Sequence, residues 1–314
     1  MQSYPFKQVD VFTATPYFGN PLAVVMNVGA ELLESSMQRF AKWTNLSETA
    51  FILPPTDASA DYSVRIFTPG SELPFAGHPT LGSCHAWLQA GGIPRSEDFV
   101  VQQCKVGLVK IRQEPGVAGA PDRLAFAAPP LKRTAPNPSL VAQVAAALGL
   151  EAAQITAAQM LDNGPVWLAL LLDSPEAVLT LIPNHLELVR LDVKVGVAAF
   201  YPEEAAPALI GRANREARAF GNTPAVATAT AKSPDIEVRA FAPCTGINED
   251  PVTGSLNASL AQWLMADGYA PERYVASQGV CLGRAGLVYL ERDASGEVWV
   301  GGESVTCIDG NVSL

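Results

Sequence analysis

Two short segments of the sequence place a titratable residue, a proline and a glycine where a loop would enter a helix. One is H-P-T-L-G-S, beginning at His78, and the other is D-P-V-T-G-S, beginning at Asp250. The first N–H groups of a helix have no internal partner and the helix dipole is positive there, so two such ends facing each other would bind a carboxylate. Gly77 and Gly254 would let the backbone approach the ligand closely, and Ser255 could add a hydroxyl donor.

Three titratable residues are candidates for proton transfer. His78 can donate, accept or carry a proton near neutral pH. Asp250 occupies the matching place in the second segment, although an aspartate before a proline is also an ordinary helix cap. Glu48 lies in N-L-S-E-T-A-F, between a predicted helix and an apolar run, where burial would raise its pKa. A surface glutamate that begins a strand is the commoner arrangement, so position alone does not select Glu48.

The two segments belong to a longer internal repeat. Each follows a related pentapeptide, R-I-F-T-P at 65–69 and R-A-F-A-P at 239–243, and each leads into a predicted helix that carries a Trp-Leu pair. The separations from the arginine to His78 and to Asp250 are 13 and 11 residues, so the copies are not in strict register. The repeat indicates two similar α/β halves rather than a solenoid. For one segment alone, capping by its hydroxyl residues would be the stronger interpretation, and the duplication reverses that preference.

Hydrophobic patterns predict the elements that carry these residues. Runs rich in Val, Ile, Phe and Tyr and bounded by Pro, Gly or Asn are typical of strands, and apolar residues at helical spacing are typical of helices. The predicted strands are 8–12, 22–26, 50–53, 62–67, 99–103, 108–112, 167–172, 236–241, 286–291 and 297–300. The predicted helices are 31–42, 80–88, 140–148 and 253–265.

A proline-rich stretch marks the predicted boundary between two domains. Residues 118–139 hold five prolines and few periodic apolar residues, which is typical of a passage from one domain to the next. The first half would comprise residues 1–125, joined by about 302–314 from the end of the chain. The second half would comprise residues 126–301.

Composition excludes several classes of function. Lys and Arg number 21 against 31 Asp and Glu, and the net charge of −10 disfavours nucleic-acid binding. No apolar run is long enough to span a bilayer and the N-terminus lacks the pattern of a secretory signal, so we expect a cytoplasmic protein without membrane contact. The five cysteines form no C-x-x-C pair and the three histidines have no ligand spacing, so we expect free thiols and no metal.

Five segments resemble the phenazine-biosynthesis PhzF-like family, in the order that the family has them. They are G-N-P-L-A-V-V at 19–25, N-L-S-E-T-A-F at 45–51, R-I-F-T-P-G-S-E-L-P-F-A-G-H-P-T at 65–80, E-D-P-V-T-G-S at 249–255 and Q-G-V-C-L-G-R at 278–284. Any one tetrapeptide would be a weak match. The ordered set covers nearly the whole chain and is highly specific.

The resemblance implies a mixed α/β (α+β) fold like that of diaminopimelate epimerase. Two pseudo-symmetric halves would each wrap a sheet around a central helix, with the active site in the cleft between them. It also implies an isomerase that takes a small carboxylate, needs no cofactor and forms a homodimer. The best-known member isomerises trans-2,3-dihydro-3-hydroxyanthranilate, but many relatives carry the signature without an assigned reaction, so the substrate does not follow. The chain is longer than we expect of a dedicated phenazine enzyme, and the extra length is expected within 118–231.

The family's functional residues map onto matching positions of this sequence. The implied set is Glu48, His78 and Asp250 for catalysis, and Gly77, Gly254 and Ser255 for substrate binding. We hypothesise that Glu48 removes a proton from a carbon and returns it elsewhere on the ligand, while His78 and Asp250 handle the heteroatoms.

Two alternatives remain open at the level of sequence. A racemase or epimerase of the same fold would use two facing thiols, but Cys84 and Cys244 are not equivalent in the repeat. A non-catalytic dimeric protein that binds small carboxylates would not need a carbon base.

Overall fold

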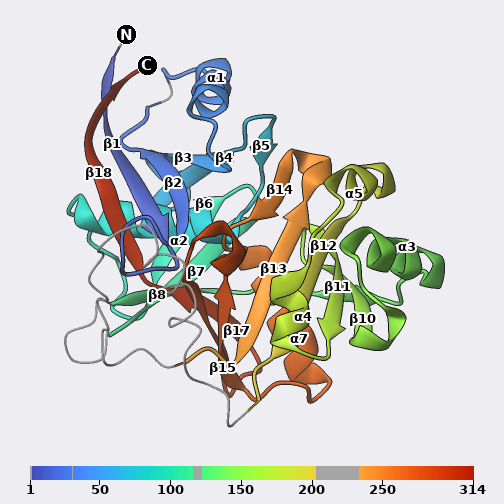
Figure 1. Cartoon of the computed structure of the whole chain (residues 1–314). Coiled ribbons are helices and arrows are strands. Elements are labelled where there is room, and N and C mark those ends of the chain that lie inside the picture. Colours follow the sequence, from blue (N-terminus) through green and yellow to red (C-terminus); the bar gives the residue numbers. More distant parts are fainter. Residues whose placement is uncertain (1, 30, 116–121, 203–232) are drawn as a thin grey trace, which may run out of the picture.

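The strands form two groups that lie side by side in the computed structural model (Figure 1). The structure describes residues 2–29, 31–115, 122–202 and 233–314. Strands β8, Arg123–Ala127, and β17, Val298–Gly302, pair antiparallel and join the two groups into one mixed sheet.

The first group of strands surrounds helix α2, Gly77–Gln89. Its further strands are β1 Ser3–Val11, β2 Asn20–Val25, β3 Glu48–Leu53, β4 Tyr62–Phe67, β5 Glu72–Leu73, β6 Val100–Cys104, β7 Gly107–Glu114 and β18 Ser304–Ser313. Neighbours pair in the order β18-β1-β2-β3-β4-β6-β7-β8, with β5 beside β4. The last strand of the chain therefore returns to pair with the first.

The second group repeats this arrangement around helix α7, Gly254–Ala266. Its further strands are β9 Lys132–Thr134, β10 Ile155–Asp162, β11 Val166–Leu172, β12 Lys194–Phe200, β13 Ile236–Ala242, β14 Ile247–Asp250, β15 Arg273–Gln278 and β16 Gly286–Arg292. Neighbours pair in the order β17-β16-β15-β13-β12-β11-β10-β9, with β14 beside β13. Two similar halves, each with a sheet around one helix, are the predicted architecture.

Glycines let each central helix pack directly against its sheet. A Cβ atom on Gly82 of α2 would lie 2.6 Å from Leu22 Cδ2 of β2, and one on Gly196 of β12 would lie 2.3 Å from Leu256 Cδ1 of α7. These distances are too short for any side chain. A single cluster of buried apolar residues surrounds both helices and runs from one half into the other.

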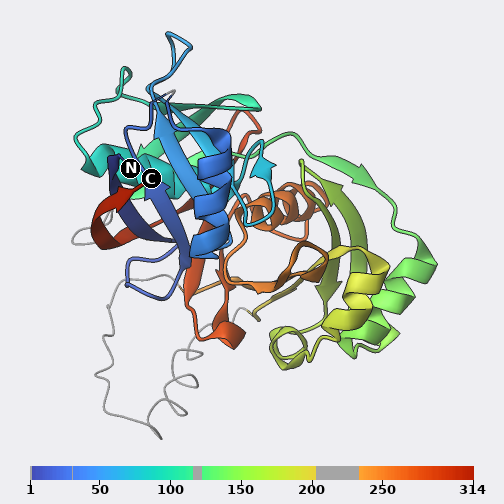
Figure 2. The same cartoon turned by 90° about the horizontal axis from the view of Figure 1, so that it is seen from above.

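The remaining helices cover the outer faces of the strands (Figure 2). Helix α1, Glu34–Thr44, packs on the first group over a separate apolar cluster. The second group carries α3 Pro138–Leu148, α4 Pro175–Thr180 and α5 His185–Leu191 over a third cluster. Short 3-10 turns are η1 Ala152–Gln154, η2 Pro243–Thr245 and η3 Val280–Leu282. Within the described residues, no helix is long and apolar enough to cross a membrane.

Every predicted strand and helix is present, with ends that differ by a few residues. The proline-rich stretch 118–139 is more structured than predicted, because its described part contains β8, β9 and the start of α3. Part of the extra length expected within 118–231, residues 118–121 and 203–231, lies outside the described residues. The division into residues 1–125 with 302–314 and residues 126–301 stays a prediction.

Candidate active site

The two central helices meet at their N-termini. A Cβ atom on Gly254, the first residue of α7, would lie 3.1 Å from the Cα of Gly77, the first residue of α2. The same atom would lie 3.2 Å from the backbone nitrogen of His78. A Cβ on Gly77 would lie 2.8 Å from the ring of Phe126. Both positions need glycine for the helix ends to come this close, and the positive ends of two dipoles therefore point at one place.

The expectation that Asp250 matches His78 is wrong. His78 lies in the first turn of α2, whereas Asp250 is the last residue of β14 and precedes the start of α7. The position that matches His78 is Ser255, the second residue of α7. Thr80 and Asn257, each fourth in its helix, support this match, because each side chain donates to the carbonyl four residues earlier, at 2.9 Å and 3.0 Å. The similarity of the two hexapeptides gives the wrong match because the Asp-Pro pair lies at the end of strand β14, whereas the His-Pro pair lies in the first turn of helix α2.

The capping alternative is also wrong for these two helices. Neither N-cap residue, Ala76 before α2 or Thr253 before α7, makes a side-chain capping hydrogen bond. The Thr253 hydroxyl instead donates to Asp250 Oδ2 at 2.5 Å. Within the described part of the chain, the first-turn N–H groups of both helices thus receive no capping hydrogen bond from their N-cap side chains.

Glu48 and His78 contact each other in a buried setting. Glu48 is the first residue of β3, and its Oε2 lies 3.5 Å from His78 Nε2, with 14% and 6% of the two side chains exposed. Neither of these two atoms has a hydrogen-bond partner in the described part of the chain. Burial, with a smaller contribution from the charge of Asp250, raises the pKa of Glu48 to about 8. Burial lowers the pKa of His78 to about 3. At neutral pH the contact therefore joins two mostly uncharged groups and is not an ion pair.

Asp250 is held by a polar network behind the helix ends. Asn20 of β2 donates to Asp250 Oδ1 at 3.1 Å, and Thr253 donates to Oδ2. The Gln278 amide donates to the Asp250 carbonyl at 2.9 Å and also accepts from Asn257 at 2.8 Å. Burial raises the pKa of Asp250 to about 6, although the hydrogen bonds from Thr253 and Asn20 oppose that rise. At pH 7 Asp250 is mostly ionised while Glu48 mostly keeps its proton, so the two carboxyl groups differ in charge.

Ser255 is oriented by two residues of the second half. Its hydroxyl accepts from Trp167 Nε1 at 3.3 Å, and its carbonyl accepts from Asn163 Nδ2 at 2.9 Å. Asn163 and Trp167 belong to no motif of the sequence, and nothing in their local pattern indicates a site. Asn20 and Gln278 were also missed as individual residues, although they stand in the G-N-P and Q-G-V segments that carry the family resemblance.

Cys84 and Cys244, the two thiols considered for a racemase, lie in elements that are not equivalent in the two halves. Cys84 is buried inside α2, and burial raises the pKa of its thiol. Burial also raises the pKa of the half-buried Cys244 thiol, which lies in η2. Both thiols are therefore poor bases at neutral pH. Among the described residues no group of three or more His, Cys, Asp or Glu could hold a metal ion.

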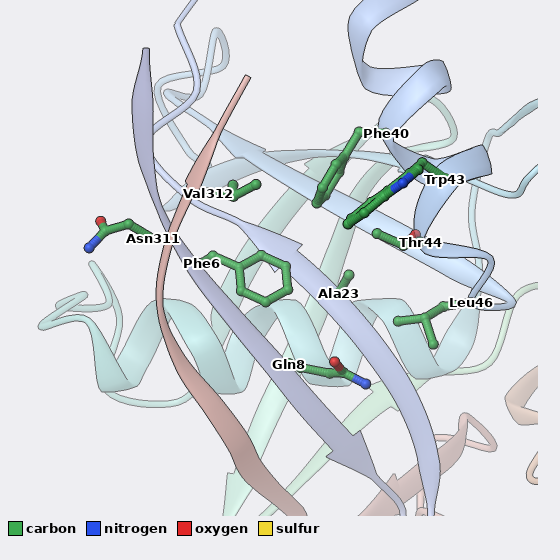
Figure 3. A pocket seen from close by; sticks show the side chains of 9 residues that line it. All are labelled: Phe6, Gln8, Ala23, Phe40, Trp43, Thr44, Leu46, Asn311 and Val312. Atoms are coloured by element: carbon green, nitrogen blue, oxygen red, sulfur yellow. The ribbon is translucent and has the colours of Figure 1, made fainter. Parts of the chain in front are cut away.

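A surface cavity of about 390 Å³ lies away from these residues. Figure 3 shows its lining side chains on the face of β1 and β2 that is turned away from α2. The lining residues are Phe6, Gln8, Ala23, Phe40, Trp43, Thr44, Leu46, Asn311 and Val312. None of the six predicted site residues is among them.

The fold is shared with solved epimerase-like proteins. A PhzF-family protein from Bacillus anthracis superimposes with a TM-score of 0.79 over 100% of both chains, at 19% sequence identity. A hydroxyproline epimerase from Agrobacterium vitis superimposes with a TM-score of 0.58 over 99% of this chain and 93% of that chain, at 13% identity. At such identities the likeness shows the fold alone, and the predicted fold class is confirmed.

Sequence comparison identifies the family within that fold. The family model described as phenazine biosynthesis-like protein matches residues 9–310. Trans-2,3-dihydro-3-hydroxyanthranilate isomerase of Pseudomonas aeruginosa is 30% identical over 98% of both chains. Antisense-enhancing sequence 1 of Schizosaccharomyces pombe is 32% identical over 99% of both. The chain belongs to the phenazine biosynthesis-like PhzC-PhzF family and is an isomerase.

Proposed function

We propose that this isomerase moves a proton between two positions of a small carboxylate, with Glu48 as general acid/base and without a cofactor. The observation that carries the proposal is the contact between Glu48 Oε2 and His78 Nε2, both buried and without another partner in the described residues. Buried polar atoms are rarely left unpaired, and such atoms beside two helix N-termini are suited to a ligand.

The ionisation of Glu48 suits proton transfer in both directions. With a pKa of about 8, on the order of a tenth of Glu48 is ionised at pH 7 and can remove a proton from carbon. The protonated form can return the proton to another carbon of the same ligand. His78, uncharged at this pH, can donate or accept a hydrogen bond at a ligand heteroatom, and Asp250 can accept from a ligand hydroxyl or amine.

The site favours a ligand with a carboxylate and a hydrogen-bond donor. The first turns of α2 and α7, at Gly77–His78 and Gly254–Ser255, would bind the carboxylate, while Asp250 would attract the donor. Trans-2,3-dihydro-3-hydroxyanthranilate, named for the Pseudomonas aeruginosa relative, combines these groups and is the first ligand to test.

The test is NMR of the purified chain with this ligand in heavy water. We expect conversion with deuterium incorporated at the accepting carbon, and at least a hundredfold slower conversion by Glu48→Gln, which removes the acid/base but keeps the shape. Glu97→Gln, at an exposed position, is the matched control and should convert at the wild-type rate. Equal rates for Glu48→Gln and wild type would refute the role of Glu48.

The two alternatives make different predictions. A thiol-dependent racemase would lose activity on alkylation, whereas the proposed mechanism is insensitive to it. A binding protein would retain the ligand and incorporate no deuterium.

We further propose a cytoplasmic homodimer. Sedimentation of the purified chain at about twice its monomer mass would support the dimer.

A further inference from the structure

The strand registers show that a lysine of the second half occupies the position equivalent to that of Glu48 in the first half. In the first half, Thr49 of β3 pairs with Phe67 of β4. In the second half, Val195 of β12 pairs with Phe241 of β13. The two phenylalanines are equivalent, because each ends an R-x-F run whose arginine guanidinium lies over the phenylalanine ring, at 5.2 Å and 5.0 Å from the ring centroid.

The residues one place earlier are Glu48 and Lys194. Each is the first residue of its strand, and each pairs across a parallel neighbour, Glu48 with Leu22 of β2 and Lys194 with Trp167 of β11. The fold therefore brings a carboxyl from one half and an ammonium from the other to equivalent positions around the meeting point of α2 and α7.

Contacts tie Lys194 to the same site. Its Nζ lies 5.8 Å from the ring centroid of Trp167, and the indole N–H of Trp167 donates to the Ser255 hydroxyl in the first turn of α7. The positive charge of Lys194 also acts on the carboxyl groups of both Glu48 and Asp250, lowering the pKa of each. The ammonium is thus close enough to both carboxyls to influence their protonation.

Lys194 nevertheless forms no ion pair with a residue that the structure describes. It is half-buried, and within the described residues no carboxylate oxygen lies within 4 Å of its Nζ. A half-buried ammonium whose charge acts on two carboxyls without pairing with either of them has donors that no described carboxylate uses. Trp167 links the ammonium to Ser255 in the first turn of α7, where the helix dipole also favours an anion.

We propose that Lys194 is a substrate-binding residue whose ammonium binds the carboxylate of the ligand, beside the first turns of α2 and α7. The inference rests on the proposed function for the position of the ligand, and it adds a residue that no family motif of this sequence contains. It also makes the site selective for a carboxylate over a neutral group of the same shape.

The test compares two probes of nearly equal shape, anthranilate and its neutral counterpart 2-aminobenzamide. Isothermal titration calorimetry with the full chain measures their dissociation constants for wild type, Lys194→Met and Lys194→Arg. We expect wild type to prefer anthranilate, Lys194→Met to bind it about ten- to a hundredfold more weakly, and Lys194→Arg to retain most of the affinity. Binding of 2-aminobenzamide should change less than about twofold.

Lys110→Met is the matched control. Lys110 lies on β7, and its Nζ also lies over an aromatic ring, 5.3 Å from the centroid of Phe99. This variant should bind both probes as wild type does. Equal losses for both probes in Lys194→Met, or no preference of wild type for anthranilate at millimolar concentrations, would overturn the proposal. Deuterium exchange that depends on Glu48 tests the proposed function separately, so either can fail while the other stands.

Discussion

The buried carboxyl of Glu48 makes folding stability depend on pH. Below pH 4.5 it is protonated in the folded and the unfolded chain, whereas between pH 4.5 and about 8 only the unfolded chain ionises. Its contribution is therefore fully present at low pH and is lost as pH rises toward 8. Glu48→Gln cannot ionise, so the free energy of unfolding of wild type should fall relative to this variant by on the order of 5 kcal/mol across that window.

Urea unfolding of both proteins from pH 4.5 to pH 9 checks this prediction. His78 and Asp250 titrate in both proteins, so the difference isolates Glu48. If the free energy of unfolding of wild type instead rose with pH relative to Glu48→Gln, the folded chain would stabilise the ionised form of Glu48. If the two free energies changed in parallel, the Glu48 carboxyl would be solvated in the folded chain.

The candidate site could be predicted as a set of residues but not as a geometry. Family motifs name Glu48, His78 and Asp250, whereas the physics of the local sequence favours a surface role for Glu48. The residues that surround the Glu48 carboxyl come from distant segments of the chain. His78 lies 30 residues after Glu48, and Asp250 lies a further 172 residues on. Lys194 has no motif at all and becomes visible only through the register of β12 on β13.

At the scale of elements, a buried ion pair holds the strand that ends in Asp250. Arg239 of β13 binds Glu249 of β14 through two hydrogen bonds, at 2.9 Å and 2.8 Å, and also donates to two carbonyls near the end of α4. The two side chains are 5% and 9% exposed. The first half repeats the pair with Arg65 and Glu72, where Arg65 is 26% exposed and Lys105 also contacts Glu72.

Replacing Arg239 should therefore cost far more than replacing Arg65. Arg239→Met leaves a buried carboxylate and two carbonyls without their donor, and we expect a loss of about 3–5 kcal/mol in the free energy of unfolding. Arg65→Met leaves the Glu72 carboxylate, which is 7% exposed, paired with Lys105, so its charge keeps a partner and we expect a loss of about 1 kcal/mol. Urea unfolding measures both. Equal losses would show that burial of the second pair does not decide its energy.

Most strongly apolar segments are predicted from the sequence and weakly patterned ones are missed, although β12, with the apolar sequence K-V-G-V-A-A-F, is also absent from the predicted strands. Apolar runs such as β2 and β11 and the buried helices α2 and α7 are found at nearly their observed ends. Strand β10 has the sequence I-T-A-A-Q-M-L-D, and β18 has many exposed polar residues, so neither has a clear period of two. Pairing with other strands, and not local preference, makes these segments extended.

At the scale of the whole molecule, the last strand of the chain leaves the second half and completes the sheet of the first half. Strand β8 pairs with β17 between the groups, and the chain then returns through β18 to the edge of the first group. Strand β18 pairs with β1 from Ser3–Ser313 to Val11–Ser304, and Leu314 and Gln2 exchange two backbone hydrogen bonds beyond it. The first and last segments of the sequence are therefore neighbours, as Figure 1 shows.

Removing residues 304–314 should consequently unfold the first half rather than merely shorten the chain. The truncation deprives β1 of one of its two partner strands along its whole length and leaves an unpaired edge, which favours aggregation. We expect a loss of several kcal/mol in the free energy of unfolding, or insoluble protein, because β1 also holds β2 and the strands that follow. A chain lacking only residues 313 and 314 is the control and should lose about 1–2 kcal/mol, since it gives up the terminal hydrogen bonds and the packing of half-buried Leu314 on the apolar cluster under α1. If the longer truncation instead kept wild-type stability, residues 302–314 would not be part of the first half, and the proposed division of the chain would fail.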